Sequence, residues 1–217
     1  MNHDETIQKT ITFVKDTLAE AEGGHDWWHV SRVWSLAKLI LEDEKADRLV
    51  VELGALLHDI ADSKFHGGNE DVGPEKAIVF LESLDVDTEV ISHVENIIRH
   101  VSFKGGNHEQ AFRSPELDLV QDADRIDAIG AIGIARTFNY GGFIGAKLYD
   151  PDIPAKLNMS KEEYKKNIDP TINHFYEKLL LLKDRMNTTA GKTIAEKRHE
   201  YMEEFLNQFY REWNGEV

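Results

Sequence analysis

Apolar residues recur every three or four positions along most of this chain, which is the period of an α-helix that buries one face. The first such stripe predicts an amphipathic helix over about residues 5–21. Asp26 is a natural N-cap for a second helix, which would carry His29 in its first turn. A wider apolar pattern over residues 47–61 predicts a buried third helix with His58 near its C-terminal end.

The helical pattern continues through most of the remaining chain. Pro74 can occupy the first turn of a further helix, and Pro115 can begin another whose apolar spacing continues to Ile129. Residues 139–170 hold three of the five prolines, so regular structure is weakest there, and a loop of this length is usually functional or disordered. Two apolar stripes predict helices at the C-terminal end, one of Phe175, Leu179, Leu182 and Met186 and one of Met202, Phe205, Leu206, Phe209 and Trp213.

No segment shows the clear alternation of apolar and polar residues that marks a half-buried strand, and no repeat or low-complexity tract is present. The pattern therefore predicts an all-α fold in which residues 1–217 form one compact domain of many helices. Within it, we expect a core over about residues 26–130 to hold the chemically active groups. Residues from about 170 to 215 would form a C-terminal helical part.

Composition suits such a domain and narrows its partners. Of the 217 residues 41% are hydrophobic, which is enough for a sizeable core. A formal net charge of -15 argues against a nucleic-acid-binding surface, although a bound cation can still hold a mononucleotide phosphate in an acidic protein. The chain has no cysteine, and no apolar run approaches the ~20 residues of a membrane span. We expect a cytoplasmic protein that binds neither nucleic acid nor membrane.

Three clusters of histidines and carboxylates lie within this helical pattern. His29 occurs in HDWWHVSRV, the doublet His58 and Asp59 in GALLHDIADSK, and three aspartates in LVQDADRIDAIG. Together they offer mixed nitrogen and oxygen ligands, which suit a catalytic divalent ion better than a closed thiolate site does. Neighbouring helix positions differ by about 100°, so the doublet would flank an ion at the helix end. These residues predict metal-assisted hydrolysis.

The order and context of the clusters resemble the HD superfamily of metal-dependent phosphohydrolases. The likeness is greatest to small bacterial HD-domain proteins that act on nucleotides, because HDWWHVSRVW, ALLHDIADSKF, DADRIDAIGAIGIARTF and NHFYEKLLLLKDRMNT all look like motifs of that subgroup. It extends from about Asp26 to the C-terminal helix. The resemblance implies an HD-domain fold, a divalent cofactor (Mn²⁺, Co²⁺, Ni²⁺ or Mg²⁺), and metal ligation by His29, His58 and Asp59.

The fourth ligand is selected by the resemblance. By residue type alone Asp122, Asp124 and Asp127 are all candidates. The superfamily's Ala-Asp-Arg pattern matches residues 123–125, which points to Asp124. Asp127 follows three residues later and returns to nearly the same helix face. It would therefore hold the free N–H of a ligand histidine, or a metal-bound water, in place.

Asp62 is the predicted catalytic residue. It lies three residues after Asp59, so it should return to the same helix face beside the metal. Some nucleotide-cleaving HD enzymes carry an acidic residue here that orients or activates the attacking water. The alternative is that Asp62 caps the helix end or pairs with Lys64. The chain also departs from the common HD-x-G-K pattern and has Ser63 where a second acid is usual, so the exact mechanism of those proteins does not transfer.

Phosphate needs cations that approach it from outside the metal. Lys64, Arg125 and Lys147 are the predicted binding side chains, because lysine acts as a point charge and arginine as a two-point clamp. His100 would contact phosphate or a second metal, as in related HD subgroups, or have a simple structural role. Aromatic residues of the long loop would either stack on a base or pack the loop: Tyr140, Phe143 and Tyr149.

One function and two alternatives follow from these residues and the resemblance. The first is hydrolysis of nucleoside triphosphates to monophosphate and pyrophosphate, with the ion neutralising charge while Asp62 directs water. A nucleotide phosphomonoesterase is the other enzyme, and a noncatalytic metal and nucleotide sensor is the alternative from a different class. The full ligand set favours an enzyme. Exposed faces of the C-terminal helices leave room for a homodimer, although core packing alone explains their stripes.

Overall fold

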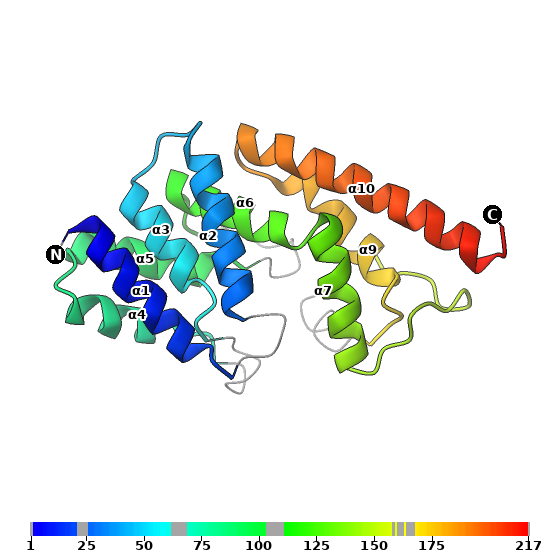
Figure 1. Ribbon diagram of the computed structural model, residues 1–217, viewed down its shortest axis with the longest axis horizontal. Coiled ribbons are helices and arrows are strands. Elements are labelled where there is room, and N and C mark those ends of the chain that lie inside the picture. The colour runs from blue at the N-terminus through cyan, green and yellow to red at the C-terminus, as the bar shows by residue number, and fades with distance from the viewer. Residues whose placement is uncertain are drawn as a thin grey trace. The chain divides into compact units, whose positions relative to one another are not determined.

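The computed structural model describes residues 2–20, 26–61, 69–102, 111–157, 159, 163 and 168–216. Every secondary-structure element in these residues is helical, which confirms the predicted all-α fold (Figure 1). The chain divides into two compact units, residues 1–124 and 125–217. The single domain over residues 1–217 stays a prediction. None of the described helices is both long and apolar enough to cross a membrane.

The first unit is built around one central helix. Helix α3 contacts α1, α2 and α5, while α4 packs on α5. All residues of α3 from Val50 to Leu57 are buried, as its wide apolar pattern predicts. The helices of this unit are α1 (His3–Thr17), α2 (Trp27–Leu41), α3 (Arg48–Leu57), α4 (Val72–Ser83), α5 (Thr88–His100) and the greater part of α6 (Pro115–Asp127).

Side-chain caps set where the two helices of the predicted metal site begin. The Asp26 carboxylate accepts a 2.9 Å hydrogen bond from the His29 backbone N–H, which confirms Asp26 as the N-cap of α2. Asp47 caps α3 in the same way. This helix ends at Leu57, earlier than the expected 61, with His58 as its C-cap. The His58 ring bonds the carbonyl of Ala55 and so takes up one of the acceptors left at the helix end.

The second unit holds α7 (Gly130–Phe143), α9 (Asn173–Glu177), two short 3₁₀ turns η3 (Leu179–Leu181) and η4 (Lys183–Arg185), and the long α10 (Thr189–Trp213). Helix α10 packs on α7. The predicted helix carrying Phe175 through Met186 is wrong in its continuity, since Lys178 leaves helical geometry at φ -142° and ψ -58°. Its four apolar side chains are nevertheless buried, so the pattern correctly located the core.

An aromatic cluster closes the C-terminal half of α10. Tyr149 packs edge-on against Phe209, Tyr210 and Trp213, with a ring separation of 4.9 Å to the tryptophan. Burial, together with a hydrogen bond to Tyr176, raises the pKa of Tyr210. Loop packing therefore accounts for Tyr149. The predicted start of the loop at residue 139 is wrong, because α7 continues to Phe143. The other two aromatics assigned to that loop therefore lie on α7, where both are exposed: Tyr140 and Phe143.

Candidate metal centre

Four predicted ligands converge in the first unit. One ligand atom from each of His29, His58 and Asp59 lies within 4.8 Å of the others. The two Nε2 atoms are 3.3 Å apart, and Oδ2 of Asp59 is 3.7 Å from Nε2 of His29. Oδ1 of Asp124 lies 3.6 Å from Nε2 of His29 and 3.8 Å from Nε2 of His58. Segments far apart in sequence thus bring two imidazoles and the Asp59 carboxylate into one group, and Asp124 lies beside both imidazoles.

Each ligand is carried by a helix terminus. His29 lies in the first turn of α2, where the Asp26 cap fixes the backbone. His58 caps the end of α3, and Asp59 follows directly in a turn. Asp124 lies in the last turn of α6. Helix α2 packs against α3 (Figure 1). The start of α2 and the end of α3 therefore bring both histidines together.

A hydrogen bond fixes the orientation of the His58 ring. Its Nδ1 lies 2.8 Å from the carbonyl oxygen of Ala55, which can only accept, so Nδ1 carries the proton. The neutral ring therefore has a bare lone pair on Nε2, the atom that faces His29. A backbone carbonyl bound to the outer nitrogen is the usual way in which a metal-binding histidine is held.

The donor set fits a divalent cation. Two ligand atoms held about 2.1 Å from one ion at neighbouring positions are about 3.0–3.4 Å apart, which includes the observed separation of the two Nε2 atoms. Two carboxylates beside two neutral imidazoles also carry two negative charges, which a divalent ion would balance. Histidine and aspartate together suit Mn²⁺, Co²⁺, Ni²⁺ or Mg²⁺ without strong selection among them.

Within the part of the chain that the structure describes, the centre is more exposed on its carboxylate side than on its imidazole side. The side chains of His29 and His58 are only 2% and 3% exposed, whereas those of Asp59 and Asp124 are 20% and 30% exposed. The imidazoles therefore lie on the buried side of the centre. A molecule entering from solvent would approach from the side of the carboxylates. An open side is what distinguishes a catalytic metal site from a structural one.

The three aspartates of DADRID occupy different surroundings. Asp124 is the one placed against the histidines. Asp122 is fully buried. Asp127 is also fully buried, and its Oδ2 accepts a 2.7 Å hydrogen bond from Nη1 of Arg136. The predicted role of Asp127, to hold a ligand histidine or a water in place, stays a prediction. The ion pair between Asp127 and Arg136 was not predicted from the sequence.

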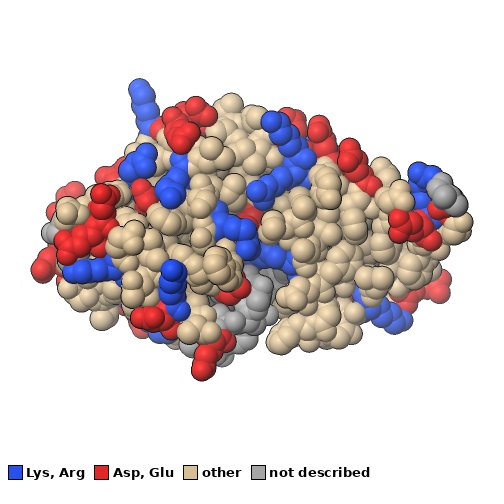
Figure 2. Space-filling model, in the orientation of Figure 1, with Lys and Arg blue, Asp and Glu red and all other residues tan. Residues whose placement is uncertain are grey.

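Two predicted site residues, Asp62 and Lys64, lie outside the described residues. Arg125 is half-buried, and its Nη1 donates a hydrogen bond to the carbonyl oxygen of Arg185. Lys147 forms a 2.7 Å ion pair with Asp150, which raises the lysine's pKa. Basic side chains lie among acidic ones on the face shown in Figure 2, so the acidic chain still offers local positive charge.

His100 shares one feature with His58. Its Nδ1 also bonds a backbone carbonyl, that of Asn96 at 2.8 Å, so its Nε2 is bare in the neutral ring. The amide of Gln121 in turn donates to the carbonyl oxygen of His100 and links the end of α5 to α6. These contacts suit either of its predicted roles, as a ligand-contacting group or as a structural one.

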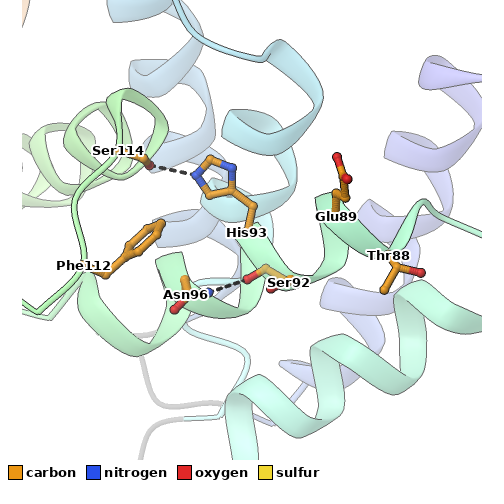
Figure 3. A pocket seen from close by; sticks show the side chains of 7 residues that line it. All are labelled: Thr88, Glu89, Ser92, His93, Asn96, Phe112 and Ser114. Atoms are coloured by element: carbon orange, nitrogen blue, oxygen red, sulfur yellow. Dashed lines mark hydrogen bonds between the residues drawn. The ribbon is translucent and has the colours of Figure 1, made fainter.

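A surface depression of about 470 Å³ lies along α5, apart from the four ligands (Figure 3). Within this depression, Nε2 of His93 and Oγ of Ser114 share a 2.8 Å hydrogen bond. The His93 ring also packs edge-on against Phe112. Ser114 also accepts from the Leu117 N–H at the start of α6. Its described lining includes no lysine or arginine, so these residues offer phosphate no cation. Here His93 and Ser114 tie α5 to α6.

Comparison with known proteins agrees with this geometry. Residues 27–129 match the HD domain family. The chain is 39% identical to the uncharacterized protein YpgQ of Bacillus subtilis (strain 168) over 207 aligned residues. The alignment covers 94% of this chain and 92% of YpgQ. The chain belongs to the HD family. HD domains are metal-dependent, and the group of His29, His58 and Asp59 could hold the ion.

Solved structures support the same assignment. An HD-superfamily hydrolase from Bacillus thuringiensis is 47% identical with a TM-score of 0.77, over 98% of this chain and 99% of that one. A Lactobacillus plantarum protein is 37% identical with a TM-score of 0.85, over 98% of each chain. The structure of Bacillus subtilis YpgQ in complex with ADP superposes with a TM-score of 0.77. This structural alignment covers 98% of this chain and 97% of YpgQ, and the sequence identity within it is 34%. The chain is thus an HD-superfamily hydrolase.

Proposed function

We propose that this HD hydrolase cleaves nucleoside triphosphates to monophosphate and pyrophosphate with one divalent ion held by His29, His58, Asp59 and Asp124. The observation that carries the proposal is the convergence of two imidazole Nε2 atoms and the Oδ1 of Asp124 within 3.8 Å. The bound ion would supply charge neutralisation at the phosphate oxygens and activation of the attacking water.

The protein's own groups divide the remaining work. The carbonyl of Ala55 holds the His58 ring so that its bare nitrogen faces the centre. The partly exposed carboxylates of Asp59 and Asp124 border the open side where phosphate would enter. Asp62 would orient the water, and Lys64, Arg125, Lys147 and His100 are the proposed substrate contacts. Asp127 would hold the free N–H of a ligand histidine, or a metal-bound water, in place.

Nucleotide recognition is supported by the ADP complex of YpgQ, a relative that matches nearly the whole chain. A diphosphate in that relative favours a phosphoanhydride substrate over a plain phosphate ester. The cytoplasm, where nucleoside triphosphates are abundant, is the proposed location. The helical faces left exposed on α10 would also allow a homodimer.

The test is a hydrolysis assay on metal-stripped protein, with Mn²⁺, Co²⁺, Ni²⁺ or Mg²⁺ added back. Nucleoside mono-, di- and triphosphates are compared, and phosphate and pyrophosphate are measured separately. His58→Ala and Asp62→Asn are the test variants, and His93→Gln is the control because His93 lies outside the ligand group. Pyrophosphate release that needs His58 supports the proposal.

Two other outcomes contradict it. Free phosphate released from monophosphates would identify a phosphomonoesterase. Tight binding of metal and nucleotide without turnover would identify a sensor.

Loss of activity in Asp62→Asn with metal affinity unchanged would assign the water-directing role to Asp62.

A further inference from the structure

Two arginines from other helices close the C-terminal end of α6, directly after Asp124. Nη1 of Arg198, on α10, donates a 2.6 Å hydrogen bond to the carbonyl oxygen of Ile126, which also accepts a longer one, of 3.2 Å, from the Ile129 N–H. Nη1 of Arg136, on α7, donates to the carboxylate of Asp127. The last carbonyls of a helix lack partners within it, and a cation there also complements the helix dipole. Both arginines therefore stabilise the final turn of α6.

Gly130 provides the space that Arg198 needs. This glycine has a φ of +74° where the chain turns from α6 into α7. A Cβ there would lie 2.9 Å from Cγ, 3.0 Å from Cβ and 3.1 Å from Cδ of Arg198. The aliphatic stem of Arg198 thus packs directly on the glycine backbone on its way to Ile126. Any side chain at this position would be strained by the φ angle and would displace the arginine.

The turn that Arg198 holds carries a proposed metal ligand. Ile126 lies two residues after Asp124 on the same helix, whose last residue is Asp127. Helix ends fray when their terminal carbonyls lose partners, and a ligand in a fraying turn loses its fixed direction. Asp124 Oδ1 must stay near the two histidine nitrogens, at 3.6 and 3.8 Å, to share an ion with them.

We propose that Arg198 is a positioning residue for Asp124, which it holds in place by ordering the last turn of α6. Gly130 leaves the space through which the Arg198 side chain reaches that turn. Its connection to the metal rests on the function proposed above. The ordering of the turn does not, because the hydrogen bond to Ile126 exists without an ion. An arginine suits the task better than a lysine, since its stem can lie flat on Gly130 while the guanidinium reaches the carbonyl.

The test compares Arg198→Met, which keeps an apolar stem, with Arg198→Lys, which keeps the charge. Gly130→Ala perturbs the same contact from the other side. Lys197→Ala is the control, because it removes an exposed positive charge from the neighbouring position of α10. Hydrogen–deuterium exchange of residues 124–129 is measured without metal, and Mn²⁺ affinity is measured by electron paramagnetic resonance of free Mn²⁺.

In Arg198→Met and Gly130→Ala we expect the amides of residues 124–129 to exchange about tenfold faster. Mn²⁺ affinity should fall about 10- to 100-fold, the usual effect of losing an outer support of a metal ligand. The visible absorption bands of bound Co²⁺ should also shift, since they report ligand geometry. Arg198→Lys should show a smaller change in each measurement than Arg198→Met does. Lys197→Ala should leave the exchange rates, the Mn²⁺ affinity and the Co²⁺ spectrum at wild-type values.

Unchanged exchange in Arg198→Met would overturn the inference. So would faster exchange with wild-type Mn²⁺ affinity and Co²⁺ spectrum, because Arg198 would then be only structural. If wild-type protein binds no Mn²⁺, the proposed function fails and the positioning of a metal ligand fails with it. In that case localised faster exchange would still show that Arg198 orders the turn, so the two failures are distinguishable.

Discussion

The indole nitrogen of Trp34 donates a 2.8 Å hydrogen bond to Oε2 of Glu52, which links α2, whose first turn carries His29, to α3, whose C-cap is His58. Glu52 is only 5% exposed on α3. Its other oxygen lies 3.3 Å from Nε2 of His3 and 3.6 Å from Arg48. A buried carboxylate thus joins α1, α2 and α3, and these partners offset the cost of its desolvation.

Replacing Glu52 should therefore destabilise the fold. We expect Glu52→Ala to lower the free energy of unfolding by about 2–4 kcal/mol, because the Trp34 N–H loses a charged acceptor and a small cavity remains. Urea denaturation followed by circular dichroism measures the change. The exposed Glu42→Ala is the control and should change stability by less than about 0.5 kcal/mol. Equal stabilities for the two variants would refute the structural role of Glu52.

Two aspartates three residues apart should respond differently to the same substitution. Asp124→Asn should lower metal affinity more than about 100-fold with little loss of stability, since Asp124 is a partly exposed proposed ligand. Asp127→Asn should lower stability by about 2–3 kcal/mol, because it weakens the buried pair with Arg136. Because Asp127 would hold a ligand or a water in place without binding the ion itself, we expect a smaller loss of metal affinity, about tenfold. Titration calorimetry and denaturation distinguish the effects, and the reverse pattern would make Asp127 the ligand.

Metal binding should stabilise the folded protein. The ligands come from three helices, so the complete set exists only in the folded state, and Mn²⁺ at 100 times its dissociation constant should add about 2.7 kcal/mol. Differential scanning fluorimetry of chelator-treated protein should show Tm rising with Mn²⁺ concentration. The rise should disappear in His58→Ala and persist in His93→Gln. An equal rise in His58→Ala would place the ion elsewhere.

His174 should make the protein sensitive to acid. Desolvation, reinforced by the charge of Lys178, lowers its pKa from 6.5 to about 3. Well above pH 6.5 the ring is neutral in both the folded and the unfolded chain. As the pH falls from 6.5 toward 3, the unfolded chain binds a proton that the folded one does not, so stability decreases.

The expected loss from this histidine between pH 7 and pH 5 is about 1–2 kcal/mol. It is measured as the difference in unfolding free energy at the two pH values. His174→Gln should remove that part of the pH dependence, whereas the exposed control Lys197→Ala should retain it. An identical pH dependence in wild type and His174→Gln would show that the ring protonates equally in both states.

Local signals predicted much of the fold. The Asp26 cap, the buried α3 and the start of α6 at Pro115 all follow from residues close together in sequence, since helix periodicity and capping act within a few positions. The end of α3 was placed too late because the His58 side chain competes for a helix carbonyl. The break at Lys178 was missed because the apolar spacing around it remains that of a helix.

The sequence by itself determined an all-α chain with histidines and aspartates in the order of an HD hydrolase. Only the tertiary structure decided that His29 and His58, 29 residues apart, bring their nitrogens within 3.3 Å. It also placed Asp124, which the resemblance had already selected, 3.6 Å from the nitrogen of His29. It also decided that Arg198 reaches a carbonyl 72 residues away. Helix formation depends on neighbours in the chain, whereas these meetings depend on how whole helices pack, and periodicity carries no information about packing partners.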